Sequence, residues 1–253
     1  MKRIVLKLSG KIIDNEENLK ILSEKIKSAS NFQFIIIHGG GIQITNLYKK
    51  LKIEPEFVDG LRITSWEEME IVEMVLSGIV NKKIVNLFLK NDIDTIGISG
   101  RDNLLFGKPK EEKLKRVGII TKVNIEIFDK LKSFKAIVIS PVSNDEDFLP
   151  LNVNADDAAT AIAIALKVEY LFLFSDVEGV LDKNGNVIEK INESKVEELI
   201  NYGVVKEGMI VKLKSSIEAI KKGVKNIIIT KINNSFSFDN IDSNNFKKTI
   251  ISS

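Results

Sequence analysis

The chain has 253 residues, of which 44% are hydrophobic and 28% charged, and its 37 basic residues nearly balance 35 acidic ones to a formal net charge of +2. Because basic and acidic residues are interleaved, this composition excludes the basic surface of a nucleic-acid-binding protein. The absence of cysteine and the presence of one histidine, His38, exclude disulfides, a thiol nucleophile and a histidine-cluster zinc site. We find no signal-peptide pattern and no apolar run near the roughly 18 residues of a membrane span, so we expect a cytoplasmic protein without a membrane partner.

In the first half of the chain, short apolar runs alternate with amphipathic segments. Apolar runs at four places predict buried strands: 3–9, 32–38, 94–99 and 134–141. Apolar residues at helical spacing predict three helices, the last with Ser65 as N-cap and a break near Gly78: 15–30, 42–51 and 65–91. The remaining segments predict a β-ribbon and two hairpins: 53–63, 103–125 and 142–151.

The second half repeats this alternation. It predicts helices at 154–166, 193–202 and 209–222, strands at 169–176 and 225–230, and a possible last strand at 248–252. Strands that alternate with helices predict an α/β fold with an open, mostly parallel sheet covered by helices on both faces. We expect two lobes of one molecule, 1–150 and 151–253, rather than separable domains.

The sequence HGGG, residues 38–41, follows a buried strand and suits two chemistries. One is the oxyanion hole of a lipase-like hydrolase, and the other is a turn whose backbone N–H groups hold phosphate. A hydrolase also needs a G-x-S-x-G elbow and a second histidine, and both are missing. The G-x-G-x-x-G dinucleotide motif and the Walker A motif are missing too. The glycines therefore favour a phosphate turn, with a simple tight turn as the alternative.

Polar residues suited to anions stand at the ends of several predicted strands and at the start of predicted helices. They occur in the motifs KLSG (7–10), GLR (60–62), NVNADDAA (152–159), SDVEGV (175–180) and GMIVK (208–212). Ligands of open parallel sheets bind outside the carboxyl ends of the strands. Two lysines, an arginine and two glycine turns at that edge indicate a site for a polyanion and a carboxylate.

These motifs, together with HGGG and in this order, resemble those of the N-acetylglutamate kinase branch of the amino-acid kinase family. The resemblance covers residues 1 to about 230 and is weak in the tail. It implies an αβα sandwich whose first lobe holds the acyl amino acid and whose second lobe holds the nucleotide. The implied reaction is ATP-dependent phosphorylation of the side-chain carboxylate of N-acetyl-L-glutamate, in arginine biosynthesis.

The resemblance also implies roles for individual residues. Lys7 and Lys212 would flank the transferred phosphoryl group, and Asp156 would hold both ammonium groups. The residues implied for the acceptor substrate are Gly40, Gly41, Arg62 and Asn152. Those implied for the nucleotide are Ser9, Gly10, Gly41, Asp176, Val204, Val205 and Lys206.

Simpler interpretations stand beside these roles. Asp156 could be an acid in the first turn of a helix, Lys212 a solvated lysine and Arg62 a surface charge on the ribbon. His38 is expected to be a packing or turn residue, because a carboxylate is already a nucleophile at neutral pH and requires no general base. Magnesium is expected to be held mainly by the phosphates, with no metal-binding residues of the protein.

Other functions of the chain remain open at this point. The alternatives are a uridylate kinase, a kinase of carrier-protein-linked aminoadipate, an N-succinylglutamate kinase and a non-catalytic sensor. In the branch it resembles, arginine-inhibited members carry a helix before the first strand. Since the first strand here begins at residue 3, we expect a homodimer without arginine inhibition. The dimer contact is expected on the 66–90 helix, through Met69, Val72, Leu76 and Val80, with core packing as the alternative.

Overall fold

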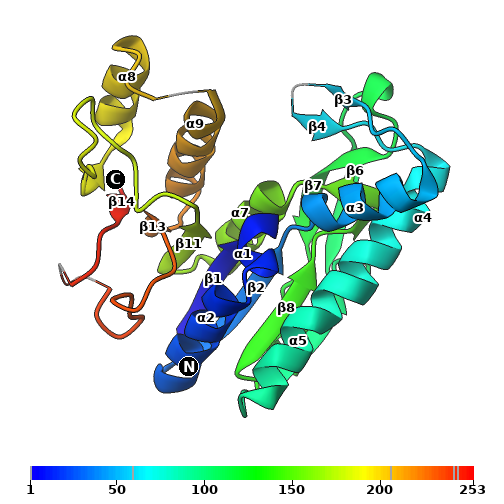
Figure 1. Cartoon of the computed structure of the whole chain (residues 1–253), viewed down its shortest axis with the longest axis horizontal. Helices are drawn as coiled ribbons and strands as arrows, with labels where there is room; N and C mark the ends of the chain where they lie inside the picture. The colour runs from blue at the N-terminus through cyan, green and yellow to red at the C-terminus, as the bar shows by residue number, and fades with distance from the viewer. Residues whose placement is uncertain (1, 59, 206, 242, 244) are drawn as a thin grey trace.

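The computed structural model describes residues 2–58, 60–205, 207–241, 243 and 245–253, and it is built around an eight-stranded sheet (Figure 1). In spatial order the strands are β12 (Lys190–Ile191), β14 (Thr249–Ile251), β13 (Asn226–Thr230), β11 (Tyr170–Phe174), β1 (Lys2–Leu8), β2 (Phe32–His38), β8 (Ala136–Ser140) and β5 (Thr95–Ser99). Neighbouring strands are parallel except β13 and β14. The predicted open, mostly parallel sheet is confirmed, including the possible last strand.

The central strands are apolar on both faces because both faces are covered. In β1, Ile4, Leu6 and Leu8 belong to one buried cluster, while Val5 belongs to the cluster on the opposite face. Side chains alternate along a strand, so Lys7 shares the face of Val5. The period of two therefore directs this lysine toward the helices of the second half of the chain.

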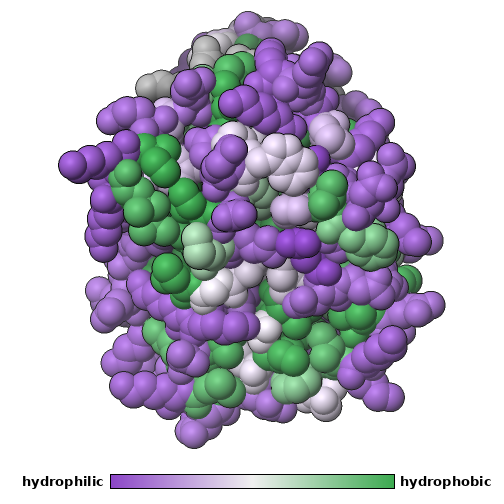
Figure 2. Space-filling view, turned by 90° about the vertical axis from the view of Figure 1, so that its right-hand side faces the viewer, coloured by the Kyte–Doolittle hydropathy of each residue, from purple (hydrophilic) through white to green (hydrophobic). Residues whose placement is uncertain are grey.

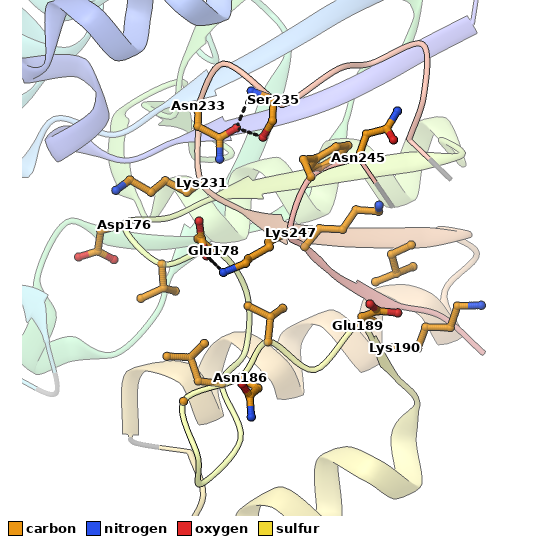
Figure 3. Close-up of a pocket in the computed structure, with 17 residues that line it drawn as sticks. Asp176, Glu178, Asn186, Glu189, Lys190, Lys231, Asn233, Ser235, Asn245 and Lys247 are labelled. Atoms are coloured by element: carbon orange, nitrogen blue, oxygen red, sulfur yellow. Dashed lines mark hydrogen bonds and ion pairs between the residues drawn. The ribbon is translucent and has the colours of Figure 1, made fainter. Parts of the chain in front are cut away.

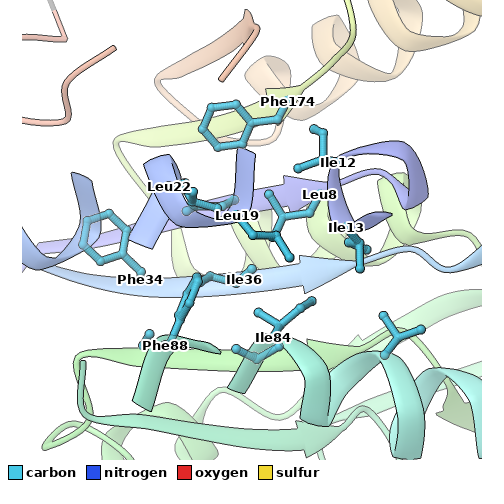
Figure 4. Close-up of a cluster of buried hydrophobic side chains, with 14 of the residues drawn as sticks. Leu8, Ile12, Ile13, Leu19, Leu22, Phe34, Ile36, Ile84, Phe88 and Phe174 are labelled. Carbon is cyan, nitrogen blue, oxygen red and sulfur yellow. The ribbon is translucent and has the colours of Figure 1, made fainter. Parts of the chain in front are cut away.

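Helices cover the sheet on two sides, which confirms the αβα sandwich. On the first face lie α1 (Gly10–Asp14), α2 (Glu16–Ser28), α3 (Gly41–Leu51), α4 (Trp66–Glu73) and α5 (Asn81–Lys90). On the second lie α6 (Glu126–Lys130), α7 (Ala155–Leu166), α8 (Glu193–Asn201) and α9 (Glu207–Lys221). Figure 4 shows the first core, where Leu19 and Leu22 of α2 lie near Leu8 and Phe34 of the sheet.

The predicted 65–91 helix is continuous rather than broken near Gly78. Residues Met74–Val80 form a π-helical segment that joins α4 to α5. The N-terminus of α4 has a capping box. In it, Ser65 Oγ accepts from the N–H of Glu68 (3.2 Å) and Glu68 Oε2 accepts from the N–H of Ser65 (2.6 Å). The predicted N-cap at Ser65 is therefore confirmed.

The apolar face of this helix belongs to the core, not to a surface. The four residues expected at a dimer contact are buried within the chain: Met69, Val72, Leu76 and Val80. That prediction is wrong, because helical periodicity identifies an apolar face but not what covers it. The exposed large apolar residues of this element are Trp66, Met74, Ile79 and Leu89. Figure 2, viewed from the side of α4 and α5, shows hydrophobic areas separated by hydrophilic ones.

The predicted hairpins combine into a second, smaller sheet. Its strands are β6 (Leu105–Pro109), β7 (Val117–Val123), β9 (Ser143–Asn144) and β10 (Pro150–Val153), and they close on themselves. The predicted ribbon is formed by β3 (Phe57–Val58) and β4 (Leu61–Arg62). Since β1 pairs directly with β11, the two predicted lobes share one sheet.

Candidate active site

The candidate site lies at the carboxyl ends of β1, β2 and β11. From β1 the chain continues to β2 on one side, whereas from β11 it continues to β13 on the other. Two adjacent strands whose connections leave in opposite directions open a crevice where ligands of such sheets bind. Ser9 and Gly10 follow β1 at this crevice, Gly39–Gly41 follow β2, and Asp176 follows β11.

Lys7 and Lys212 lie near one carboxylate, that of Asp156. Lys7 is only 8% exposed, and its Nζ donates to Asp156 Oδ2 at 3.0 Å. Burial lowers the pKa of Lys212, Asp156 opposes this shift, and the charge of Lys7 adds to it. Asp156 is also the first-turn acid of α7, with Asn154 as N-cap, so the simpler interpretation of this residue is confirmed, while its role toward both lysines stays a prediction. The other oxygen of Asp156, Oδ1, is buried without a hydrogen-bond partner among the described residues.

Glycine stands at positions 40 and 41, after β2, for two different physical reasons. A Cβ on Gly40 would lie 2.4 Å from Cδ2 of Leu76, which approaches from the π-helical segment. A Cβ on Gly41 would meet nothing within 4 Å. Gly41 begins α3, so unpaired N–H groups at this helix start are available to an anion. Close approach therefore requires a glycine at position 40, while position 41 keeps the helix start open.

We expect Gly40→Ala to destabilise the protein by about 1–3 kcal/mol, because the added methyl group overpacks a buried contact with Leu76. Gly41→Ala is the matched control and is expected to change the free energy of unfolding by under about 0.5 kcal/mol. Urea unfolding of both variants measures the difference. Equal stability of the two would contradict the proposed contact.

His38 is a structural residue, as expected. It is fully buried, its Nδ1–H donates to the carbonyl of Gly39 (2.9 Å), and its Nε2 accepts from the amide of Asn81 (3.4 Å). Burial lowers the pKa of His38 to about 4. A buried neutral imidazole with both nitrogens engaged does not act as a base, which removes the hydrolase interpretation of HGGG.

Acid is expected to destabilise the protein through His38. The pKa of this side chain is about 4 in the folded protein against an ordinary value of 6.5. Between these values the unfolded chain binds a proton that the folded chain does not, so stability rises with pH across this window. As pH falls through the whole window about 3 kcal/mol is lost, of which about 2 kcal/mol is lost by pH 5. Urea unfolding of His38→Gln against the wild type, at neutral pH and near pH 5, isolates this loss; parallel losses in both proteins would contradict it.

Arg62 is buried rather than a surface charge on the ribbon. Its guanidinium carbon lies 4.9 Å from the ring centre of Tyr48 and 4.7 Å from that of Phe57. Nη2 donates to Thr45 Oγ1 (2.8 Å) and to the carbonyl of Gly41 (3.4 Å). Nη1 is buried with no hydrogen-bond partner in the described part of the chain. A buried guanidinium with an unused nitrogen at a cavity suits a carboxylate ligand.

Arg62 and Asn152 line one cavity with the glycine turn and the Lys7–Asp156 pair. Its volume is about 270 Å³. The polar lining residues include Lys7, Gly40, Gly41, Arg62, Asn152 and Asp156, and the apolar ones include Ile44, Leu61, Leu76, Val117 and Pro141. The structure thus brings the predicted acceptor residues together. Leu76 and Pro141 were not predicted, because only the tertiary structure places them at the turn.

A second cavity, of about 620 Å³, adjoins the first and shares Lys7, Gly10, Gly41 and Arg62 with it. Ser9, Asp176 and Lys212 line it too, so most of the predicted nucleotide residues meet here. The sequence analysis missed Lys11, although it follows Gly10 directly. Its Nζ lies 3.0 Å from Asp176 Oδ2, and this hydrogen bond is the main reason why the pKa of Asp176 is lowered.

A third cavity, of about 890 Å³, begins at Asp176 and extends beside β13 and β14 (Figure 3). Glu178 and Lys247 form an ion pair across it, with Lys247 Nζ 3.0 Å from Glu178 Oε2. Val204 and Val205 pack against the second core and line none of these three cavities. Lys206 lies outside the described residues.

Comparisons with known proteins identify the family of the chain. The sequence pattern of the amino acid kinase family matches residues 2–231. An acetylglutamate kinase from Campylobacter curvus is 40% identical over 221 residues, covering 86% of this chain and 79% of the relative. One from Bacillus pumilus is 38% identical over 231 residues, covering 90% and 89%. An N-acetylglutamate synthase structure from Neisseria gonorrhoeae, 17% identical, shares the fold with a TM-score of 0.86 over 100% of this chain and 59% of that one. The chain belongs to the amino acid kinase family.

Proposed function

We propose that this chain transfers the γ-phosphoryl group of ATP to the side-chain carboxylate of N-acetyl-L-glutamate. The products are ADP and N-acetyl-L-glutamyl 5-phosphate, the second step of arginine biosynthesis. The observation that carries the proposal is the Lys7–Asp156–Lys212 group beside a cavity that holds Arg62 and Asn152. The identity to acetylglutamate kinases supports the choice of substrate.

The proposed reaction is a direct in-line displacement. A carboxylate oxygen of the acceptor forms a bond to phosphorus while the bond to the ADP oxygen breaks, and no proton has to move. Phosphoryl transfer requires positioning and charge stabilisation, which Lys7 and Lys212 supply to the phosphoryl oxygens. Asp156 keeps the two ammonium groups near each other and offsets their mutual repulsion.

The acceptor and the nucleotide occupy neighbouring cavities in this proposal. Arg62 binds the α-carboxylate of the acceptor, and Asn152 with Gly40 and Gly41 contacts its other polar groups. Ser9, Gly10 and Gly41 bind phosphoryl oxygens, and Asp176 lies on the nucleotide side with residues 204–206. The acceptor side therefore consists mainly of residues from the first half of the chain, with Asn152 from the second half. The nucleotide side combines Ser9, Gly10 and Gly41 with residues of the second half.

Magnesium would bridge the phosphates of ATP and neutralise part of their charge. Across the described residues no group of three or more histidine and carboxylate side chains could hold a metal ion. The two carboxylates of the site, Asp156 and Asp176, are each paired with a lysine. These residues fit an ion that is held mainly by the nucleotide.

We also propose that the chain forms a homodimer. The exposed apolar side chains of the α4–α5 element replace the buried ones as candidates for the contact, and they are Trp66, Met74, Ile79 and Leu89. None of the described helices is long and apolar enough to cross a membrane. Light scattering measures the mass in solution, and the mass of a monomer would contradict this proposal.

The proposed reaction is tested by a hydroxamate assay for acyl phosphate with ATP and magnesium. Hydroxamate with N-acetyl-L-glutamate supports the proposal, and a stronger signal with N-succinyl-L-glutamate would reassign the acyl group. ADP release with UMP alone would identify a uridylate kinase. No product from any of them would favour the carrier-linked acceptor or a sensor.

A further inference from the structure

Thr64 connects two of the proposed acceptor-binding residues. Its side chain is completely buried, and its hydroxyl donates to the carbonyl of Arg62 at 3.0 Å. The side-chain amide of Asn152 donates to the same hydroxyl, with Nδ2 2.9 Å from Oγ1. Thr64 does not line the cavity that holds Arg62 and Asn152. It therefore contacts the site only through these neighbours.

The hydroxyl of Thr64 decides which way the amide of Asn152 faces. A threonine hydroxyl has one proton to donate, and the carbonyl of Arg62 can only accept. The hydroxyl proton of Thr64 therefore goes to the carbonyl of Arg62, and only a lone pair of Oγ1 is left for Asn152. A lone pair can only accept, so the amide of Asn152 must donate to it through its NH₂ group rather than face it with its oxygen. Oδ1 of Asn152 is consequently turned away from Thr64.

The backbone holds this arrangement in register. The N–H of Arg116 donates to the carbonyl of Thr64 (2.9 Å), and the N–H of Asn152 donates to the carbonyl of Arg116 (2.9 Å). Thr64 also forms a parallel β-bridge with Lys115. One short segment thus fixes the positions of both Thr64 and Asn152, so the amide cannot avoid the hydroxyl by a backbone shift.

We propose that Thr64 is a positioning residue that turns Oδ1 of Asn152 toward the cavity as a hydrogen-bond acceptor. The group it accepts from is the amide N–H of an N-acylated amino acid. This inference rests on the proposed function and deepens it, because it assigns recognition of the acyl N–H to one atom. An acceptor whose amide nitrogen is replaced by an ester oxygen would place two lone pairs against each other.

The test compares N-acetyl-L-glutamate with (S)-2-acetoxyglutarate, in which an ester oxygen replaces that nitrogen. We expect the wild type to prefer the amide in kcat/KM by about 10- to 100-fold, since the ester leaves Oδ1 of Asn152 without a hydrogen-bond donor in the occupied site. Thr64→Val should reduce this preference to within about 3-fold, because the amide of Asn152 is then free to turn. Thr64→Ser keeps the hydroxyl and should retain the preference. The KM for ATP should change by less than about 2-fold in every variant.

Thr64→Ala replaces the valine variant if the latter does not fold, and urea unfolding checks both. A valine or alanine variant that keeps the wild-type preference would overturn the role of Thr64 while leaving the proposed reaction intact. Wild-type enzyme that phosphorylates neither acceptor would overturn the proposed function itself, and with it this inference. A loss of activity equal for both acceptors would show that Thr64 supports the fold only.

Discussion

Replacing Lys212 with alanine is expected to lower kcat by about 100- to 1,000-fold, with small changes in KM for either substrate. The ammonium group meets developing charge on the phosphoryl oxygens, so its loss acts on the transition state rather than on binding. Lys7→Ala is expected to have an effect of the same size. Steady-state kinetics of ADP release with N-acetyl-L-glutamate as acceptor measure both.

Lys214→Ala is the matched control, since Lys214 is exposed on the same helix and lines neither of the two cavities of the site. It should leave kcat unchanged. Because burial lowers the pKa of Lys212, the protonated fraction of this residue falls at a lower pH than for an ordinary lysine. Activity should decline early on the alkaline side for that reason. A Lys212→Ala enzyme with normal kcat would remove Lys212 from the proposed mechanism.

Replacing Arg62 with glutamine is expected to raise the KM for N-acetyl-L-glutamate by about 10- to 100-fold and to change kcat by much less. The buried guanidinium has an unused nitrogen, Nη1, at the cavity, and a charge-assisted hydrogen bond to the α-carboxylate is lost. Arg62→Lys should recover part of the affinity, because lysine keeps the charge but not the planar fork. Initial rates at varied acceptor concentration give both constants.

The control for this prediction is Arg3→Gln, an arginine near the start of β1 whose partners are Gln33 and Asp129. Its KM for the acceptor should match that of the wild type. Arg62 lines both cavities, so a raised KM for ATP in Arg62→Gln instead would assign this residue to the nucleotide side.

The two ion pairs of the site join residues that are far apart in the sequence. Lys7 and Asp156 are separated by 149 positions, and Lys11 and Asp176 by 165. The first pair could be predicted because each member stands in a recognisable motif at the end of a strand or the start of a helix. The second could not, because Lys11 shows no pattern apart from its place after Gly10. The short helices α1 and α6 were missed for a similar reason, since five residues are too few to show a period.

The amino-acid sequence was sufficient to predict the type and order of the long elements, the open, mostly parallel sheet, and the set of polar motifs at its edge. It could do so because periodicity, glycine turns and caps are local properties of the chain. The packing of the elements, by contrast, decided that Met69, Val72, Leu76 and Val80 face the core rather than a partner. It also buried Arg62 against two aromatic rings. It also decided that Leu76 requires a glycine at position 40. These outcomes depend on which elements pack together. The local sequence around an apolar or charged residue does not identify the neighbour that covers it in the fold.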